Sequence, residues 1–410
     1  MVQSVLGSLT LGYRPLWNAA RRLAGVQLFV HDDDGGQADA LHLLRTIDEL
    51  WSASSPPLLL APRSQRILAD WLGHAPPGSP PIEVRDAWLA DPATLALARA
   101  AHRRGLKLVW RGPLARLPEP EVAGLFDTSL LGVATSDAVA ALQMARGPRT
   151  GASAPVNPVF AGQIYEDVAS RALLTHCLDT SGALALAGWP TEDVLHSLRH
   201  QLQQPAHEVV LRLLKAIDDE QSIDRFEQVL GQDPLLAYRF MNYTNSAALG
   251  LRTGVSSLRR GLVMMGYNSI RRWLGDQLPG ASTEPDLRPV RESMVLRARL
   301  AEQLIQAGAG KELRSEVYLC SLFSQLDLLL GEPLGTILRR LPLSDRVYDA
   351  AVQHDGPYAA SLDVAAALEG DDVAVLRQLC KRHELEREHV NRSLLQMLRA
   401  LAPAADAQGA

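Results

Sequence analysis

The chain has 410 residues, with 41 basic and 46 acidic side chains and a formal net charge of −5. A length of this order predicts two domains rather than one. The near balance of charges argues against a general attraction to DNA, RNA or anionic lipid, so we expect neither a nucleic-acid partner nor a membrane partner.

The cysteines and the apolar runs indicate the compartment. Cys177, Cys320 and Cys380 are far apart in the sequence, and none belongs to a C-x-x-C pair. Isolated thiols are typical of a reducing compartment rather than of a disulfide framework. No apolar run approaches the ~20 residues that span a bilayer, and the first residues lack the basic segment of a secretory signal. We therefore expect a cytoplasmic protein.

Residues 1–195 alternate short apolar runs with helical stretches. The expected strands are Leu58–Ala61, Ile82–Val84, Leu106–Trp110 and Leu130–Val133, and the expected helices are Ala38–Ser52, Gln65–Leu72, Ala93–Arg104 and Asp137–Ala145. This alternation predicts parallel βαβ units and an α/β fold. A full barrel of eight such units takes ~250 residues, so this shorter domain predicts a trimmed barrel with shortened or missing helices.

Residues 196–402 show helical periodicity and no convincing strand, so we expect an all-α second domain, followed by a disordered tail at 403–410. A loop is expected at Pro285–Arg291, ahead of a long helix. The other expected helices are 206–219, Asp224–Leu230, Pro234–Tyr243, Ser256–Met265, Ser269–Leu278, a central buried helix at Ser315–Leu330, and a last helix at Glu384–Ala402.

The stretch Ile223–Leu274 carries an ordered set of helices and turns. Its landmarks are the Asp233-Pro234 break, the Asn245-Ser246 corner and the turn at Gly266. This order resembles the HDOD domain, an all-helical module related to HD-type phosphohydrolases but usually without their metal site. The resemblance assigns these landmark residues a structural role and implies an adaptor that binds other proteins.

The opening LGYRPLWNAARRLAGVQLFVH resembles the first two strands of an EAL domain, the cyclic di-GMP phosphodiesterase barrel. Tyr13, Pro15 and Gly25 match the opening of that family. Together the two halves resemble the EAL-HDOD family of bacterial signalling proteins. The implied architecture is a degenerate EAL-like barrel at 1–195 followed by an HDOD domain.

The residues that carry EAL chemistry are replaced. The resemblance places Gln27 where the metal-binding Glu stands, His31 at the phosphate-gripping Arg, and Arg14 at the Gln that contacts the dinucleotide. Trp110 and Arg111 stand where a paired Asp-Asp would hold metal, and a cation there inverts the charge of the site. These losses predict no catalytic metal, no cofactor and no enzyme activity.

The chemistry of HD phosphohydrolases is also missing. On the resemblance, their His-Asp dipeptide falls on Ser324-Gln325. A true His354-Asp355 is followed at once by Gly and Pro, which predicts a turn rather than a ligand pair. His196 and His200 have the i, i+4 spacing of zinc ligands, but no catalytic Glu lies between them, and a surface or linker role is favoured. We therefore assign no catalytic and no metal-binding residue.

A local excess of arginine marks one further candidate surface. Between residues 246 and 275 there is no acidic side chain, and the basic ones are Arg252, Arg259, Arg260, Arg271 and Arg272. Clustered arginines suit the recognition of carboxylate or phosphate. The alternative is a solvated face whose acids come from another segment, such as Asp218, Asp219 and Glu220.

The sequence thus predicts a non-catalytic signal-transduction protein that acts as a protein-binding adaptor, with other signalling proteins as partners. The alternative is a cyclic di-GMP receptor that binds without hydrolysis. The hypothesis of a residual cyclic di-GMP phosphodiesterase is the least favoured.

Overall fold

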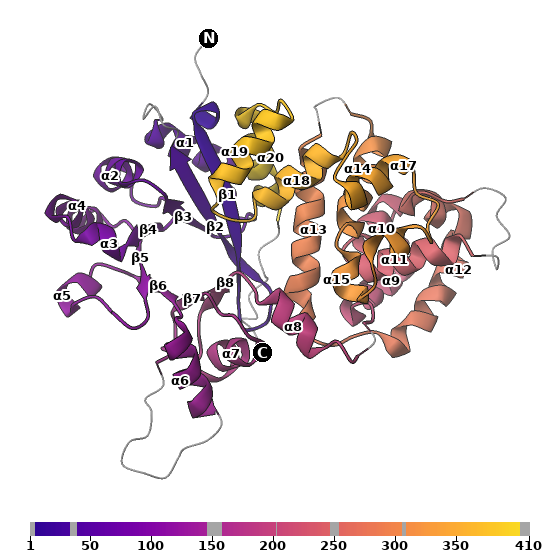
Figure 1. Ribbon diagram of the computed structural model, residues 1–410, viewed down its shortest axis with the longest axis horizontal. Coiled ribbons are helices and arrows are strands. Elements are labelled where there is room, and N and C mark those ends of the chain that lie inside the picture. Colours follow the sequence, from indigo (N-terminus) through magenta and orange to yellow (C-terminus); the bar gives the residue numbers. More distant parts are fainter. Residues whose placement is uncertain are drawn as a thin grey trace. The chain divides into compact units, whose positions relative to one another are not determined.

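A computed structural model describes residues 5–32, 39–145, 158–201, 203–246, 254–305 and 309–401. Contacts divide the chain into two compact units. The barrel unit comprises residues 1–194 and 367–410, and the helical unit comprises residues 195–366 (Figure 1). The two units are described separately below.

The barrel unit contains a closed barrel, ordered from β1 to β8. Its strands are β1 (Leu9–Trp17), β2 (Leu23–Asp32), β3 (Leu58–Pro62), β4 (Ile82–Arg85), β5 (Leu108–Pro113), β6 (Thr128–Gly132), β7 (Ile164–Glu166) and β8 (Ala185–Ala187). Strands β2 to β8 run parallel, whereas β1 is antiparallel to both of its neighbours. The expected α/β barrel is confirmed, and each of the four expected strands has a counterpart.

Helices alternate with these strands, as the sequence predicts. They are α1 (Ala40–Leu50), α2 (Gln65–His74), α3 (Asp86–Leu89), α4 (Pro92–Arg103), α5 (Pro120–Ala123), α6 (Thr135–Ala145), α7 (Arg171–Thr175) and α8 (Thr191–Ser197). The longer helices begin at side-chain caps, because Asp39, Ser64 and Asp91 accept hydrogen bonds from the first backbone N–H groups. Helices α5 and α7 have only 4 and 5 residues, so the barrel is trimmed as expected.

The barrel interior has an apolar floor. It is formed by Leu16, Leu59, Val109, Leu130, Ile164, Ala185 and Ala187. Residues two positions apart on a strand point to the same face. Arg111 therefore points inward above Val109, and Glu166 points inward above Ile164. This periodicity places a charged layer over the floor, toward the carboxyl ends of the parallel strands.

One edge of β1 is covered by the C-terminal part of the chain. Strand β8 has 3 residues and pairs with β1 only at Leu16 and Trp17. Farther along this edge, the backbone N–H of Tyr13 donates to the carbonyl oxygen of Leu368 at 2.8 Å. A Cβ atom on Gly12 would lie 2.3 Å from the carbonyl oxygen of Gly370, so this approach requires glycine.

Asn391 completes the cover of this edge. Its Oδ1 accepts from the backbone N–H of Leu11 at 3.1 Å, and its Nδ2 donates to the carbonyl oxygens of Leu6 at 2.7 Å and Leu9 at 2.9 Å. Asn391 is 1 % exposed. A single buried amide therefore satisfies two backbone groups of the β1 edge that β8 is too short to reach, and a third, that of Leu6, just before the strand.

The expected domain at 196–402 is thus corrected at its C-terminal limit. The segment after residue 366, with α19 (Val373–Arg382) and α20 (Arg387–Arg399), groups with the barrel rather than with the helices that precede it. The physical reason is the hydrogen-bonding demand of the β1 edge. The expected tail at 403–410 lies outside the described residues.

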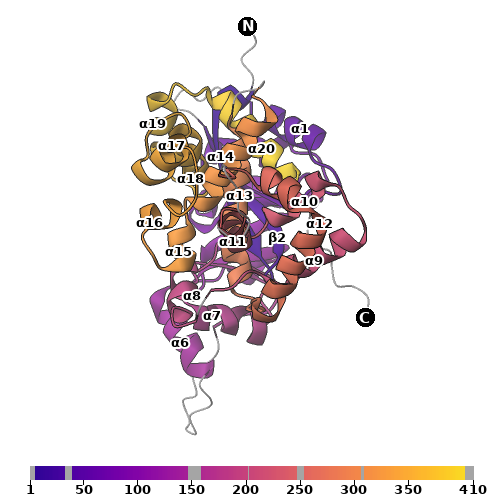
Figure 2. The same ribbon diagram turned by 90° about the vertical axis from the view of Figure 1, so that its right-hand side faces the viewer.

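The helical unit consists of helices joined by turns (Figure 2). They are α9 (His207–Asp218), α10 (Ile223–Leu230), α11 (Pro234–Thr244), α12 (Leu258–Gln277), α13 (Leu287–Gln303), α14 (Lys311–Phe323), α15 (Leu326–Leu330), α16 (Leu334–Leu338), α17 (Asp345–Tyr348) and α18 (Ala359–Ala367). Helix α11 is buried along most of its length and contacts α12, α13, α14 and α15.

Two expectations for this unit are wrong in detail. The expected loop Pro285–Arg291 is mostly helix, because α13 begins at Leu287 and a proline is tolerated in a first helical turn. The expected single helix Ser315–Leu330 is two helices, interrupted at Ser324 and Gln325. The turn at Gly266 is present as a kink within α12, where Gly266 has φ 68° and ψ 160°.

Asp233 and Asn245 hold the ends of α11. The buried Asp233 caps the helix by accepting from the backbone N–H of Leu236 at 2.8 Å, and it also accepts from that of Ala206 at 2.7 Å. Asn245 accepts from the backbone N–H of Val255 at 2.7 Å and donates to the carbonyl oxygen of Val255 at 2.9 Å. These contacts fix the two turns that carry the HDOD resemblance.

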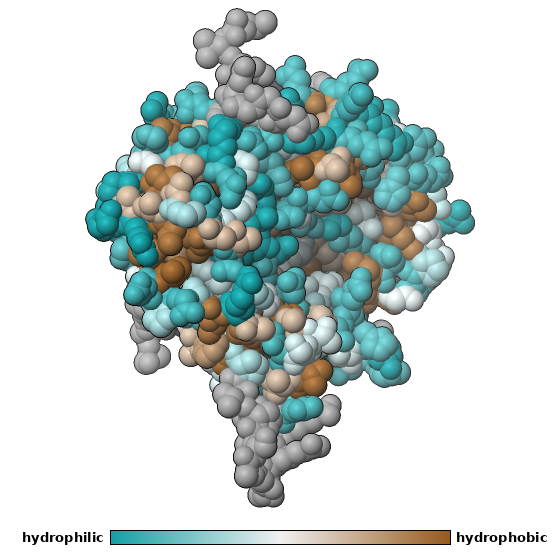
Figure 3. All heavy atoms as spheres, turned by 60° about the vertical axis from the view of Figure 1, so that its left-hand side comes forward, coloured by the Kyte–Doolittle hydropathy of each residue, from teal (hydrophilic) through white to brown (hydrophobic). Residues whose placement is uncertain are grey.

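Surface hydrophobicity is scattered on the face shown in Figure 3, where separate brown patches lie among hydrophilic side chains. Within the described ranges, none of the helices combines the length and apolarity required to cross a bilayer.

The first prediction concerns the β1 edge. Replacing Asn391 with Leu keeps a similar volume but leaves buried backbone groups of β1 without partners. Each such group costs on the order of 1–3 kcal/mol. We expect a clear loss in the free energy of unfolding, measured by urea denaturation followed by circular dichroism. The matched control is Asn268→Leu at an exposed position of α12, which should leave the midpoint nearly unchanged. Equal midpoints for Asn391→Leu and the wild type would contradict the assigned role.

Candidate functional site

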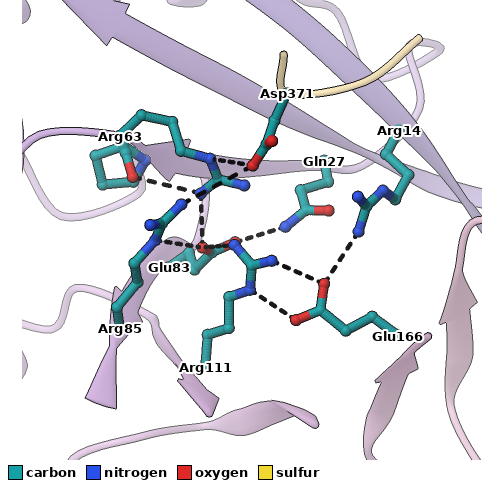
Figure 4. A network of polar contacts seen from close by, with 9 residues as sticks. Arg14, Gln27, Arg63, Glu83, Arg85, Arg111, Glu166 and Asp371 are labelled. Atoms are coloured by element: carbon teal, nitrogen blue, oxygen red, sulfur yellow. Dashed lines mark hydrogen bonds and ion pairs between the residues drawn. The ribbon is translucent and has the colours of Figure 1, made fainter. Parts of the chain in front are cut away.

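A network of charged side chains lies at the carboxyl ends of the barrel strands (Figure 4). We call it the arginine–carboxylate network. Its members are Arg14, Gln27, Arg63, Glu83, Arg85, Arg111, Glu166 and Asp371. All but Asp371 lie on barrel strands or directly after one, and (β/α) barrels carry their active sites at this end.

Glu83 is the buried centre of this network. Its side chain has 0 % exposure and accepts hydrogen bonds from Arg63 Nη1 at 2.9 Å and Arg111 Nη1 at 3.0 Å. Gln27 Nε2 donates to its second oxygen at 2.5 Å, and Arg85 Nε lies 3.9 Å away. A buried carboxylate is tolerated only when it is paired in this way.

Glu166 forms the second ion-pair centre. Arg111 grips it with two parallel bonds, from Nε to Oε1 at 2.7 Å and from Nη2 to Oε2 at 2.9 Å. Arg14 Nη1 adds a bond to Oε2 at 3.0 Å. Burial on its own would lower the pKa of Arg111, but Glu83 and Glu166 outweigh it and raise that pKa. Arg111 therefore stays charged and joins the two carboxylates.

Asp371 is the third carboxylate, and it comes from the C-terminal segment. Its Oδ2 accepts from Arg63 Nε at 2.8 Å and lies 3.9 Å from Arg85 Nη2. Burial would raise the pKa of Asp371, but Arg63, Arg111 and Arg14 outweigh it, so the pKa is lowered. The carboxylate is held in its charged form.

Phe29 supports two of the arginines from below. The guanidinium carbon of Arg63 lies 4.3 Å from the ring centroid, and that of Arg14 lies 5.3 Å from it. Cations are attracted to the face of an aromatic ring. This contact fixes the guanidinium planes while their N–H groups face the carboxylates.

His31 sits beside the network in a neutral state. Burial lowers its pKa to about 4, and the positive charge of Arg63 adds to that effect. Its Nε2 atom is buried and has no hydrogen-bond partner among the described residues. His31 therefore contributes no charge at neutral pH.

An open pocket of about 600 Å³ adjoins the network. Its charged lining residues are Arg85, Asp86, Arg111, Arg116, Glu166, Asp167 and Asp371. Arg116 is paired with Asp86. The glycines of β5 and β6, Gly112 and Gly132, leave room at its wall.

The network does not fit the two-metal site that the EAL resemblance implies. Glu83, Glu166 and Asp371 each accept a bond from at least one guanidinium group. In the part of the chain that the structure describes, no group of three or more His, Cys, Asp or Glu side chains is placed to hold a metal ion. The carboxylates are arranged to neutralise arginine instead.

The structure brings together most of the positions identified from the EAL resemblance. Arg14, Gln27 and Arg111 belong to the network, and His31 adjoins it. Trp110 does not, because it lies on the opposite face of β5 and is fully buried. Five other residues of the network were not predicted from the sequence: Arg63, Glu83, Arg85, Glu166 and Asp371. A charged residue inside the apolar run at Ile82–Val84 was the one available signal.

Two of the arginines proposed as a partner-binding surface are paired with acids of other helices. Arg259 pairs with Asp224 at 2.5 Å, and Arg271 pairs with Asp218 at 2.5 Å. The acids that pair with these arginines come from α9 and α10. This agrees with the alternative of a solvated face whose acidic side chains lie in another segment. Arg260 and Arg272 are exposed on α12, while Arg252 lies outside the described residues.

The histidines considered as metal ligands from the sequence belong to the helical unit. His354 adopts a left-handed conformation, with φ 54°, after a short helix, and its Nδ1 lies 2.9 Å from Asp363 Oδ1. His354-Asp355 is therefore a turn, as expected. His196 and His200 are both exposed.

Comparisons with known proteins agree with part of this picture. Residues 204–330 match the family model of the HDOD domain. The chain is also similar to the Cyclic di-GMP phosphodiesterase CdgJ of Vibrio cholerae, with 23 % identity over 229 residues, covering 51 % of this chain and 53 % of that protein. It is 25 % identical over 193 residues to the uncharacterized protein YuxH of Bacillus subtilis, covering 45 % of this chain and 46 % of YuxH. The matches thus span about half the length of these curated relatives.

A solved structure also matches in part. It is the crystal structure of the MmoQ response regulator from Methylococcus capsulatus, with a TM-score of 0.37 and 17 % identity, covering 47 % of this chain and 97 % of that one. By its similarity to CdgJ, the chain is a distant relative of a cyclic di-GMP phosphodiesterase, with an eight-stranded barrel in its first half and an HDOD domain in its second.

The second prediction tests the centre of the network. Glu83→Ala leaves the guanidinium groups of Arg63 and Arg111 without their shared buried counter-ion. Breaking a buried ion pair in this way costs roughly 3–5 kcal/mol. Urea denaturation should show this loss, and Glu83→Gln should also destabilise. The matched control is Glu121→Gln, an exposed position on α5. A Glu83→Ala variant as stable as the control would show that the network does not depend on Glu83.

The third prediction concerns pH. The unfolded chain protonates His31 near pH 6.5 and the folded chain near pH 4, so between these values the unfolded state binds more protons. Stability therefore falls as the pH drops through this window. The His31→Gln variant should lose less stability than the wild type between pH 6.5 and 4, measured by urea midpoints at several pH values.

The control for this experiment is His200→Gln, which removes an exposed histidine. It should keep the pH dependence of the wild type. If His31→Gln also keeps it, the buried histidine is not the source.

Proposed function

We propose that this protein is a non-catalytic signal-transduction protein that binds other signalling proteins through its helical unit. The observation that carries this proposal is an exposed apolar surface on α12, within the segment that matches the HDOD domain. We call it the α12 surface and define it by Val263, Met264 and Tyr267, which are 59 %, 46 % and 41 % exposed.

The α12 surface is held in a fixed shape. Its Tyr267 hydroxyl donates to the carbonyl oxygen of Gln221 at 2.9 Å, and its ring packs edge-on against Phe226 with centroids 5.8 Å apart. The kink at Gly266 separates this tyrosine from Val263 and Met264. Large apolar side chains that gather at the surface are typical of protein-binding sites. The exposed Arg272 lies farther along α12 and favours an acidic partner.

The arrangement of the barrel supports the absence of catalysis. In an EAL enzyme the carboxyl ends of the strands hold metal, whereas here Arg111 bridges Glu83 and Glu166. A metal ion would have to displace at least one guanidinium group from each carboxylate it used, against the positive charge of the neighbouring arginines. The experiment is an assay of cyclic di-GMP hydrolysis with added Mn²⁺ or Mg²⁺. Turnover above a buffer blank would overturn the proposal that the protein is not an enzyme.

The fourth prediction tests the α12 surface. The double variant Val263→Glu with Met264→Glu places charge on the apolar surface without touching the buried core. We expect partner recovery from lysate of the native host to fall about tenfold or more, which corresponds to ~1.4 kcal/mol of binding.

The matched control is Val375→Glu, an equally simple change at a 48 % exposed valine on α19. It should leave the recovered partners unchanged. If the double variant remains folded by circular dichroism and recovers the same partners, the binding surface lies elsewhere.

The second candidate function is a cyclic di-GMP receptor that binds without hydrolysis. The pocket beside the network favours it, because Arg85 and Arg111 line that pocket and guanidinium groups bind phosphate through paired N–H groups. The similarity to a cyclic di-GMP phosphodiesterase adds support. The replacements at Arg14 and His31 weigh against it. Titration calorimetry of the full chain with cyclic di-GMP decides the matter, and saturable heat that is lost in Arg85→Ala would support the receptor.

A further inference from the structure

The network contains one carboxylate that differs in origin from the others. Glu83 and Glu166 are fixed in barrel strands, with side-chain exposures of 0 % and 7 %. Asp371 arrives on the segment 367–372, and its side chain is 37 % exposed and lines the pocket. Asp371 is therefore the carboxylate of the network that can leave without disrupting a strand.

The two arginines that Asp371 faces each have an N–H group without a hydrogen-bond partner among the described residues. Asp371 binds Arg63 through Nε and approaches Arg85 through Nη2. Arg63 Nη2 and Arg85 Nε are buried and make no hydrogen bond to any described residue. A phosphate group presents more acceptor oxygens than one carboxylate, so it can satisfy donors that Asp371 leaves unmet.

The balance of charges also favours the replacement of Asp371 by an incoming anion. Glu83 and Glu166 neutralise Arg111 and Arg14 within the barrel, and both bonds to Glu166 from Arg111 are short. Asp371 supplies further negative charge to the buried Arg63 and to Arg85, which lines the pocket. If Asp371 left alone, Arg63 and Arg85 would share only the buried Glu83, and the four arginines of the network would face two carboxylates. An incoming anion would restore the balance.

We propose that Asp371 is an internal counter-anion that a phosphate-bearing ligand displaces from Arg63 and Arg85, so that binding detaches segment 367–372 from β1. This inference rests on the second candidate function and adds its regulation. Detachment breaks the bond from Tyr13 N–H to the Leu368 carbonyl oxygen. Helix α18 ends at Ala367, so detachment also frees the residues that directly follow this helix.

The test compares anion binding by the full-length wild type, Asp371→Asn and Asp372→Asn. Inorganic pyrophosphate and cyclic di-GMP are titrated separately, so that simple phosphate binding is distinguished from nucleotide binding. Asp371→Asn should bind at least one probe about tenfold more tightly than the wild type. Asp372→Asn is the matched control, because Asp372 is a neighbouring acid that caps α19 through the backbone N–H of Ala374, and Asn preserves that cap.

A second variant separates displacement from a simple change of charge. Gly12→Ala places a methyl group against the Gly370 carbonyl oxygen, which should push the segment away without altering any charge. It should also tighten binding. In the wild type, saturating ligand should accelerate hydrogen exchange at the Tyr13 amide.

Three results distinguish the displacement of Asp371 from the receptor function. Equal affinity in Asp371→Asn, Asp372→Asn and wild type, with Tyr13 still protected in the complex, would overturn the exchange while leaving a receptor function intact. Absence of binding of either probe to all variants, including Asp371→Asn, would overturn both the exchange and the receptor. Tighter binding in Asp371→Asn and Gly12→Ala, with faster exchange at Tyr13, would establish the displacement.

Discussion

The edge of β1 that faces β8 is the constraint on which the barrel unit depends. A strand edge with unpaired N–H and C=O groups is costly when buried and prone to aggregation when exposed. Strand β8 reaches only Leu16 and Trp17, so the rest of this edge takes its partners from residues 367–401. That single requirement draws the C-terminal segment onto the barrel, buries Asn391 and delivers Asp371 to the arginines.

The charged layer of the barrel follows from the same architecture. Strand periodicity turns Arg111 and Glu166 inward above an apolar floor, where water cannot solvate them fully. Each charge is therefore tolerated because an opposite charge is within hydrogen-bonding distance. The barrel uses these polar groups at the carboxyl ends of its strands for mutual neutralisation.

The sequence predicted the elements whose cause is local. Apolar runs such as Ile82–Val84 identified strands, and Arg111 was identified as a cation in the place of a metal ligand. Asp371 could not be predicted, because its position depends on a strand edge at the other end of the chain. The loop expected at Pro285–Arg291 was wrong because proline disfavours helix only beyond the first turn. Trp110 was placed correctly on a strand but on the wrong face.

The discontinuous barrel unit has a consequence for synthesis on the ribosome. The first strand emerges early, yet the residues that cover its edge emerge after the whole helical unit has been made. Domains generally fold as units while the chain is still growing. Here the helical unit can fold while the barrel waits with an open edge, a template for wrong pairing. Within this chain, the strand that is translated before the helical unit is thus the one whose edge is closed only after that unit.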